Sequence, residues 1–354
     1  MLIEYSENQA QSTSTIKDCI KLLNKLELKI LFILDENTKL VGTLTDGDIR
    51  RAILNGNELS DSILKAMNKN FIKYTQGSDL SDIENKVLKD DLQAIPVLRS
   101  NGTILEVHAA GAHLKQAKND NTVLLMAGGF GTRLTPLTDD CPKPLLKVGE
   151  KPIIQTIIEN FIEYGFHNFV ISTHYKSEMI KDYLGDGNNL NCSIEYLQEE
   201  SPLGTAGCLS LLSKKHLNKP LFMMNADILT KVNFTQLLDF HLKAETSITM
   251  CVRNYTHQIP YGVIRTNDHL IESIDEKPTK VSKVNAGIYV IDPDTIKNLT
   301  KGQNIDMPSL INNELEKNSS SVSVFPIHEY WLDIGQIEDY QKAQVDFISN
   351  FSNE

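Results

Sequence analysis

Apolar residues along the chain follow two kinds of pattern, which divide it into two parts. In the first part, a helical spacing over 16–23 precedes a strand-like run over 30–34 and a strand and helix pattern over 40–51. The order of helix, strand and strand returns between residues 80 and 105, which indicates a weak internal duplication. The pattern predicts a small α+β module, and we place it at residues 1–118.

The second part, residues 119–354, alternates strand patterns with helical ones. Helical spacing is clear over 153–162, and the short apolar runs typical of buried strands lie at 123–126, 168–172 and 221–224. Strands that alternate with helices favour a mostly parallel sheet that is covered on both faces. We therefore expect an α/β domain here.

The charge of the chain is unevenly distributed. Residues 1–118 carry 15 Lys and Arg against 16 Asp and Glu, and the remainder carries 20 against 30, within a formal net charge of −11. An acidic surface disfavours nucleic acid as a partner, because such binding needs clustered cations. If the second part binds a nucleotide, it needs local cations and a metal.

The five cysteines are scattered and form no Cys-x-x-Cys pair, which argues against a disulfide framework and against a zinc site. The N-terminus has no basic leader followed by an apolar stretch, and no apolar run approaches the length that spans a bilayer. We expect a cytoplasmic protein with no membrane partner.

A glycine-rich segment follows the first strand pattern of the second part. It reads MAGGFGTRL from Met126, and PKPLL follows from Pro142. Three glycines after a buried strand leave backbone N–H groups open to phosphate oxygens, and Arg133 and Lys143 add two cations. The segment predicts a triphosphate cradle. The alternative is an ordinary strand-to-loop connection with a solvated Pro-Lys-Pro turn.

Two better-known phosphate loops do not fit this segment. A Walker A loop ends in Gly-Lys-Ser or Gly-Lys-Thr, whereas Gly131 is followed by Thr132 and Arg133. The dinucleotide fingerprint requires a third glycine where Leu134 stands, and two prolines follow before a helix of suitable length could form.

The segment resembles the signature of the sugar-phosphate nucleotidylyltransferases. The resemblance implies a mostly parallel, Rossmann-like sheet of the GT-A type. It also implies that the glycine loop wraps a nucleoside triphosphate, while Arg133 and Lys143 act as catalytic cations on the phosphates. The nucleotide-binding positions of the loop would be Ala127, Gly128, Gly129, Gly131 and Thr132.

Two aspartates are candidates for a metal site. Asp227 closes the strand pattern that begins at Leu221, so it should lie at the carboxyl edge of the sheet, where open α/β sheets bind ligands. Asp333 lies in the otherwise apolar segment 330–335. Mg²⁺ takes few protein carboxylates, so two suffice, and both positions match metal-binding aspartates of the resembling family. A helix cap for the first and a hydrogen-bonded core acid for the second are the alternatives.

The resemblance also assigns the remaining substrate contacts. The loop around Gly204 would hold the nucleobase together with Gln198 or Glu199, and the sequence leaves open which of the two side chains does so. The sugar-contacting positions would be Gly262, Glu276, Lys277 and Asn285. The lysine would meet the sugar's 1-phosphate, while the glutamate and the asparagine would engage hydroxyls. Read in isolation, the glutamate and lysine are more typical of a solvated turn.

The first module resembles a pair of cystathionine-β-synthase-type (CBS) domains, which commonly bind nucleotides and regulate an attached enzyme. Thr45 and Asp48 match positions that contact ribose and phosphate in the first repeat, whereas Leu105 and His108 stand at the equivalent positions of the second. The pair would therefore hold at most one regulatory nucleotide, and the alternative is a pair that only packs or dimerises. Because CBS pairs usually associate face to face, we expect a homo-oligomer.

Together these resemblances imply the reaction of a nucleoside triphosphate with a sugar 1-phosphate, which gives a nucleotide sugar and pyrophosphate with Mg²⁺ as cofactor. A CBS pair before a short transferase resembles the bacterial enzymes that make GDP-glucosamine for legionaminic acid, with heptose and mannose guanylyltransferases as near relatives. GTP and glucosamine 1-phosphate are thus the expected substrates, and mannose or heptose 1-phosphate, UTP, CTP or dTTP stay open. The alternative class is a noncatalytic subunit that senses nucleotide sugars, which would be expected to have lost one of the four charged site residues.

Overall fold

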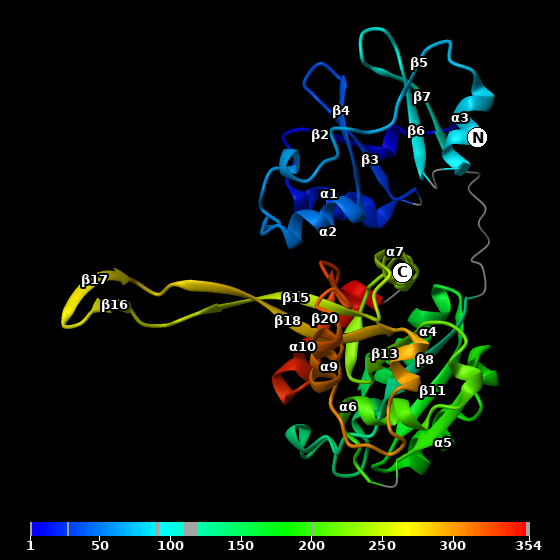
Figure 1. The fold of residues 1–354 in the computed structure, drawn as a ribbon, viewed down its shortest axis with the longest axis vertical. Coiled ribbons are helices and arrows are strands. Elements are labelled where there is room, and N and C mark those ends of the chain that lie inside the picture. Colours follow the sequence, from blue (N-terminus) through cyan, green and yellow to red (C-terminus); the bar gives the residue numbers. More distant parts are fainter. Residues whose placement is uncertain (1, 27, 90–91, 110–118, 200, 352–354) are drawn as a thin grey trace. The chain divides into compact units, whose positions relative to one another are not determined.

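The computed structural model of the protein describes residues 2–26, 28–89, 92–109, 119–199 and 201–351. The chain divides into two compact units, Met1–Lys115 and Gln116–Glu354 (Figure 1). The domain boundary predicted between residues 118 and 119 borders 110–118, which lie outside the described residues, so that boundary stays a prediction.

The first unit contains two sheets with the same local topology. In each sheet one strand pairs in parallel with the next strand, which in turn pairs antiparallel with a third. The sheets are β2 (Gln9–Gln11), β3 (Ile30–Leu34) and β4 (Leu40–Thr45), and β5 (Tyr74–Thr75), β6 (Ala94–Leu98) and β7 (Ile104–Ala109) with β1 (Leu2–Ile3) at its edge. This arrangement confirms the predicted α+β fold and its internal duplication.

Three helices accompany these sheets, α1 (Ile16–Lys25), α2 (Asp46–Leu54) and α3 (Leu80–Lys89). Two of them start at a threonine whose side chain accepts from the backbone N–H three residues on, while the aspartate at that position accepts from the threonine N–H. Such reciprocal bonds satisfy two donors that a helix start otherwise leaves unpaired.

The second unit is built on a sheet of seven strands in the order β12-β11-β8-β13-β18-β15-β19. Only β18 runs against the others, so the mostly parallel sheet predicted for this part is confirmed. The strands are β8 (Asn119–Met126), β11 (Phe166–Thr173), β12 (Ser193–Gln198), β13 (Leu221–Asn225), β15 (Ile248–Gln258), β18 (Thr279–Ile291) and β19 (Val322–Pro326).

Helices cover both faces of this sheet. One face packs on α4 (Ile153–Glu163), α5 (Ser177–Leu184), α7 (Phe234–Ala244) and α10 (Ile337–Phe351), and the other on α6 (Gly204–Gly207), α8 (Pro293–Lys297) and α9 (Met307–Lys317). Odd and even residues of β8 belong to different clusters, since Val123 and Leu125 pack on the first face and Leu124 on the second. In the first cluster the rings of Phe161 and Phe234 stack with centroids 3.6 Å apart.

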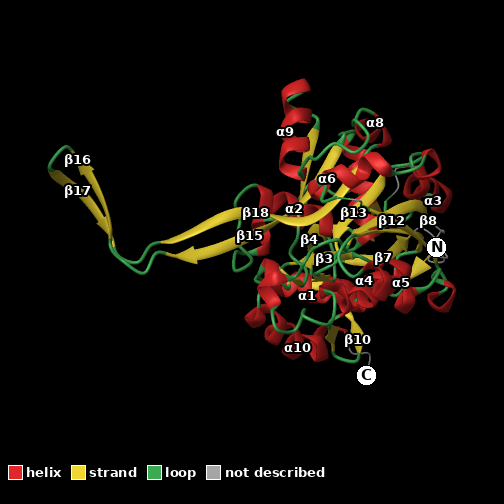
Figure 2. Cartoon of the chain, turned by 90° about the horizontal axis from the view of Figure 1, so that it is seen from below, coloured by secondary structure: helices red, strands yellow, loops and turns green. Residues whose placement is uncertain are grey.

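Three short ribbons complete the unit. They are β9 (Lys147–Val148) with β10 (Lys151–Pro152), β14 (Ile228–Thr230) with β20 (Trp331–Asp333), and β16 (Val263–Asn267) with β17 (Leu270–Asp275). The last ribbon continues the outer halves of β15 and β18, and together they form a long hairpin that projects away from the sheet (Figures 1 and 2). Across the described ranges, no helix combines the length and the apolar character needed to cross a bilayer.

Candidate active site

The glycine loop begins at the carboxyl end of β8, which lies between β11 and β13. The N–H of Ala127 donates to the carbonyl of Ser172 at 2.8 Å, and the N–H of Ala226 donates to the carbonyl of Met126 at 3.1 Å. Gly131 has a φ of 68°, and a Cβ atom there would lie 2.9 Å from Cγ2 of Thr138. A residue with a side chain would be strained in this turn, which explains the third glycine of the motif.

The two predicted metal-binding aspartates come together through the ribbon of β14 and β20. Asp333 pairs in register with Ile228, and the N–H of Ile334 donates to the carbonyl of Asp227 at 3.0 Å. Antiparallel pairing therefore holds the two acids side by side, although more than a hundred residues separate them in the sequence.

The predicted cations lie beside these acids. Lys143 donates from Nζ to Oδ2 of Asp227 and is itself largely buried. A Cβ atom on Gly335 would lie 3.8 Å from a terminal nitrogen of Arg133 and 3.9 Å from Oδ1 of Asp333, so the guanidinium and the carboxylate converge on one glycine. The structure thus brings all four charged residues of the sequence-based hypothesis into one cluster.

The surroundings of Asp333 in this cluster disfavour its charged form. Burial raises the pKa of Asp333, and the neighbouring carboxylate of Asp227 raises it further, while Lys143 and Arg133 lower it. The side chain of Asp333 is nevertheless accessible to solvent. Oδ1 of Asp227 is buried and has no hydrogen-bond partner in the part of the chain that the structure describes.

A divalent cation fits this arrangement. A buried carboxylate oxygen without a partner is costly, and hard cations such as Mg²⁺ prefer carboxylate oxygens as ligands. Oδ1 of Asp227 and the carboxylate of Asp333 would be its protein ligands. The alternative of a helix cap for Asp227 finds no support, because the residue lies between two strands.

A cavity of about 330 Å³ opens beside the glycine loop. Seven predicted site residues line it, namely Ala127, Gly128, Gly129, Lys143, Glu199, Gly204 and Asp227. The exposed ring of Phe130 also lies at this cavity and contacts the ring of His174 edge-on, with centroids 5.7 Å apart. Thr132 lies in the short 3₁₀ turn after the loop and is exposed.

The structure separates the two candidates for the base contact. Oε1 of Gln198 accepts from Nζ of Lys181 on α5, and this side chain is not part of the cavity lining. Glu199 faces the cavity, but both of its oxygens are engaged, one by the hydroxyl of Ser172 at 2.6 Å and the other by the N–H of Leu203 at 3.1 Å. Glu199 therefore anchors the loop before α6 to the sheet.

The loop at Gly204 is held against a distant segment. Gly204 has a φ of 77°, and a Cβ atom there would lie 2.7 Å from the carbonyl oxygen of Ile305. The N–H of Thr205 donates to Oδ1 of Asp306 at 3.0 Å, and the hydroxyl of Thr205 accepts from the N–H of Met307 at 2.9 Å. The helix that begins here, α6, is only four residues long and continues as a 3₁₀ turn.

A second cavity, of about 390 Å³, adjoins the first. Its lining includes Asn285 and Asp333, and it shares Thr205, Asn225 and Asp306 with the first cavity. The side-chain amide of Asn285 is engaged internally, because it donates to the hydroxyl of Tyr289 at 2.5 Å and accepts from the N–H of Gly287 at 2.9 Å.

Sequence reasoning missed the residues that both cavities share. Asp306 is the N-terminal residue before α9, and an aspartate just ahead of Met307 and Pro308 is a helix-start signal rather than a site signal. Its contact with Thr205 spans about a hundred residues of sequence, so no local pattern could have revealed it.

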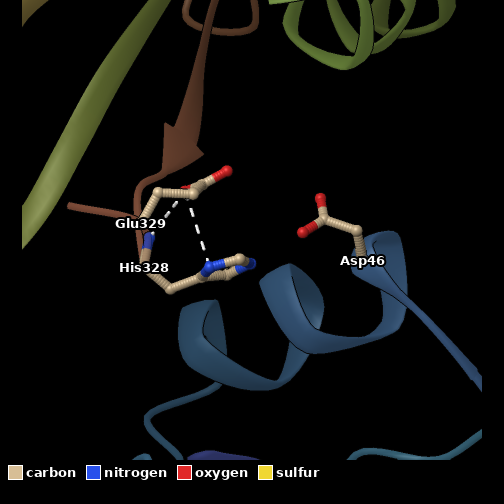
Figure 3. A group of neighbouring side chains, drawn as sticks. All are labelled: Asp46, His328 and Glu329. Atoms are coloured by element: carbon tan, nitrogen blue, oxygen red, sulfur yellow. Dashed lines mark hydrogen bonds and ion pairs between the residues drawn. The ribbon is translucent and has the colours of Figure 1, made fainter. Parts of the chain in front are cut away.

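A polar network holds the start of β20, whose first residue, Trp331, lines the second cavity. In the preceding loop, Nδ1 of His328 lies 3.5 Å from Oε2 of Glu329 (Figure 3). Arg253 donates to the carbonyl of Glu329 at 2.9 Å, and its guanidinium lies 5.8 Å from the ring centroid of Trp331. Trp331 in turn donates from Nε1 to the carbonyl of Ala286 at 2.9 Å, which ties β20 to β18.

Three predicted sugar-contacting residues do not lie at either cavity. Gly262, Glu276 and Lys277 are on the projecting hairpin, at the break between its inner and outer ladders. Gly262 and Glu276 face each other there, since a Cβ atom on the glycine would lie 2.9 Å from Oε2 of the glutamate. None of these three residues is among the described residues that line the two cavities.

The predicted regulatory residues of the first unit have structural partners. Oδ2 of Asp48 accepts from the N–H of Thr45 at 2.8 Å and from its hydroxyl at 2.7 Å, and Oδ1 pairs with Arg51 at 2.5 Å. The two residues form the cap of α2, and a regulatory nucleotide at this position stays a prediction.

Comparison with known proteins places the chain in a family. Residues 122–350 match the nucleotidyl transferase family and residues 10–55 match the CBS domain. The chain belongs to the nucleotidyl transferase family and carries an N-terminal CBS domain. The sequence-based resemblance to nucleotidylyltransferases preceded by CBS repeats is thereby confirmed.

Several curated relatives are named as guanyltransferases. A mannose-1-phosphate guanyltransferase from Pichia angusta is 34% identical over 238 residues, which cover 64% of each chain. The enzyme of that name from Debaryomyces hansenii is 32% identical and the mannose-1-phosphate guanylyltransferase from Mycobacterium tuberculosis is 28% identical, with 65% and 64% of each chain covered. The chain thus spans just under two thirds of the length of these relatives.

Solved structures share the fold. HddC from Yersinia pseudotuberculosis is 25% identical with a TM-score of 0.50, and the match covers 64% of this chain and 99% of that one. A putative glucose-1-phosphate thymidylyltransferase from Bacillus anthracis is 21% identical with a TM-score of 0.53, covering 67% and 97%.

Proposed function

We propose that the protein transfers a nucleoside monophosphate from a nucleoside triphosphate to a sugar 1-phosphate, forming a nucleotide sugar and pyrophosphate. The observation that carries the proposal is the cluster at the end of the glycine loop, in which two carboxylates lie beside a buried lysine and an arginine. Phosphoryl transfer needs such charged groups, because it depends on positioning the substrates and on neutralising their negative charge.

No general base is required for the reaction. An oxygen of the sugar 1-phosphate is already anionic near neutral pH, and it forms the new bond to the α-phosphorus. The bond from that phosphorus to the oxygen bridging to the β-phosphate breaks, and pyrophosphate leaves with the electron pair. In this scheme Arg133 and Lys143 stabilise the departing charge. Mg²⁺, held by Asp227 and Asp333, supplies further charge neutralisation when bound.

In this proposal each of the two adjoining cavities binds one substrate. The first is next to the glycine loop and suits the triphosphate and its base, with the rings of Phe130 and His174 as aromatic walls. The second contains Asn285, Tyr289 and Trp331 and suits the sugar. Both volumes fall in the range typical of small-molecule sites. Asp306 and Thr205, which line both cavities, would position the two substrates relative to each other.

We further propose GTP as the nucleotide, and the names of the curated relatives support this choice. For the sugar 1-phosphate, two observations favour different sugars. The relatives' names favour mannose 1-phosphate, whereas a CBS domain before a short transferase favours glucosamine 1-phosphate and a role in legionaminic or another nonulosonic acid.

A substrate panel tests the proposal. The purified protein is assayed for pyrophosphate release with GTP, UTP, CTP and dTTP against the 1-phosphates of glucosamine, mannose, heptose and glucose. We expect release that requires both substrates and a divalent cation, with GTP preferred. Binding of nucleotide sugars without pyrophosphate release for any pair would contradict the enzymatic proposal and favour a sensing subunit.

A further inference from the structure

The projecting hairpin, residues 253–284, is here called the arm. Its base is the outer half of β15 and β18, and its tip is the ribbon of β16 and β17 (Figures 1 and 2). The ladder is continuous up to the pair Gln258 and Thr279, and the N–H of Ile259 donates to the carbonyl of Pro278 at 3.1 Å. The arm is therefore an ordered two-stranded ribbon and not an open loop.

The arm holds Lys277 far from the chain's own cavities. Asn285 lines the sugar-side cavity, and Lys277 lies in the bend two residues before β18 begins at Thr279. An extended strand advances about 3.4 Å per residue, so the six residue steps of β18 from Asn285 to Thr279 alone span roughly 20 Å. No side chain spans that distance.

The sugar-side cavity lacks a positive charge of its own. Among the described residues that line it, two are acids, Asp306 and Asp333, and none is a lysine or an arginine. A sugar 1-phosphate carries a doubly charged phosphate group, and binding it next to two carboxylates requires a cation. A bound Mg²⁺ would offset the charge of Asp227 and Asp333, so the phosphate group of the sugar still needs a lysine or arginine that the described lining does not provide.

The surface of the arm is suited to burial against another protein surface. Large apolar side chains stand exposed along it, among them Tyr261, Ile264, Leu270 and Ile274, with exposed fractions from 52% to 75%. Ile264 and Ile274 are cross-strand partners, so they form a single apolar spot near the tip. An isolated two-stranded ribbon is only marginally stable in water, and such exposed apolar surface is typical of an interaction site.

Charge favours a second copy of the same chain as the partner. The arm carries five Lys and Arg against four Asp and Glu, whereas the rest of residues 119–354 carries 15 against 26. A slightly basic arm is thus complementary to the acidic body of another copy. Two copies related by a two-fold axis would each supply one arm and one open cavity, which closes the assembly.

We propose that the arm of one copy lies across the sugar-side cavity of a second copy and brings Glu276 and Lys277 to the sugar 1-phosphate there. Each active site is then built from two chains. Lys277 supplies the missing cation to the phosphate, and Glu276 binds the sugar. This inference rests on the proposed function, because it assigns the second substrate of that reaction.

Paired variants test the inference directly. Asp227→Asn disables the site of its own chain, and Lys277→Ala disables the arm. The two variants are coexpressed with different tags, and dimers carrying both tags are isolated. If the arm acts on the partner, one site of each mixed dimer has both defects and the other has none. Assayed with the sugar 1-phosphate below its KM, where Lys277→Ala slows the reaction, the mixed dimer should then show about half of the wild-type rate per dimer.

Control variants distinguish a failure of the shared-site proposal from a failure of the proposed function. Lys277→Ala alone should raise the KM for the sugar 1-phosphate by at least about tenfold with little change in the KM for GTP, as expected for loss of a charged hydrogen bond. Lys219→Ala, which removes an exposed lysine outside the arm, should leave both constants unchanged. A mixed dimer as inactive as its parents, or a monomeric wild-type protein, would overturn the shared site. An inactive wild-type protein would overturn the proposed function instead.

Discussion

At the scale of single residues, the site is defined by carboxylates held close together against their own repulsion. The pKa of Asp333 is raised by burial and then by Asp227, so the folded protein binds a proton there more readily than the unfolded chain does. In the absence of a cation, stability should therefore fall as the pH rises from about 4 through this raised pKa. Lys143 and Arg133 lower the pKa of Asp333, and a bound divalent cation would add to their effect.

Removing one of these charges should consequently stabilise the metal-free protein. We predict that Asp333→Asn raises the Tm at pH 7 in the presence of a chelator and lowers turnover by at least about 100-fold. Differential scanning calorimetry with and without Mg²⁺ checks the first part. Mg²⁺ should raise the Tm of the wild type more than that of the variant. A variant that is less stable than the wild type in chelator would contradict the account.

The cysteines should differ in reactivity because burial differs among them. Burial raises the pKa of Cys19 and Cys208 to about 12 and that of Cys192 to about 11, whereas Cys141 is only partly buried and its pKa is raised less. The thiolate is the reactive form. We predict that iodoacetamide at pH 8 labels Cys141 first, as read by peptide mass spectrometry. Equal labelling of the buried thiols in the native protein would contradict this.

Several site residues could be predicted from the sequence because their signals are local. The glycine loop, Arg133 and Lys143 lie in one short segment, and Asp227 ends a recognisable buried strand. Asp306 could not be predicted, since its role depends on a bond to Thr205 about a hundred residues away. Gln198 and Glu199 were indistinguishable for a related reason, because strand pairing decides which of two neighbouring side chains faces the cavity.

At the scale of elements, the site depends on short segments that dock onto the carboxyl edge of the sheet. The β14 and β20 ribbon sets the spacing of the two acids, and the contact between the Gly204 loop and α9 shapes both cavities. The strands and the longer helices were predictable from the period of their apolar residues. The shortness of α6 was not, because it has no local signal: the backbone at Gly204 packs against Ile305, about a hundred residues away.

This packing makes Gly204 sensitive to substitution. Its φ is positive, and an added methyl group would meet the backbone of Ile305 at 2.7 Å. We predict that Gly204→Ala destabilises the protein by about 1–3 kcal/mol and raises the KM for the nucleotide, because the loop must shift away from α9. Urea unfolding and steady-state kinetics measure the two effects. Thr205→Val should act mainly through its lost bond to Met307 and cost about 1 kcal/mol.

A fully stable Gly204→Ala variant with unchanged kinetics would show that the close approach of the two segments is not needed for the site.

At the scale of the whole molecule, two units have separate cores. The two clusters that enclose the sheet contain only residues of the second unit, and the clusters of the first unit contain only its own. Each unit therefore has the apolar core that an independent domain needs. The arm was not predictable as a separate feature, because its alternating residues have the same pattern as a strand inside the sheet.

From this separation we predict that a fragment of residues 119–354 folds alone and keeps the basal reaction within about twofold of the full chain. Near-UV circular dichroism and the pyrophosphate assay check folding and activity. An aggregated fragment, or a folded one without activity, would show that the first unit is part of the catalytic machinery.

The central claim is that Asp227, together with Asp333, Lys143 and Arg133, forms the site of nucleotidyl transfer. The most direct test compares pyrophosphate release by the wild type and by Asp227→Asn under saturating GTP, sugar 1-phosphate and Mg²⁺. We predict a variant that keeps the wild-type circular dichroism spectrum and turns over at least about 100-fold more slowly. A folded variant with a near-normal rate would contradict the claim.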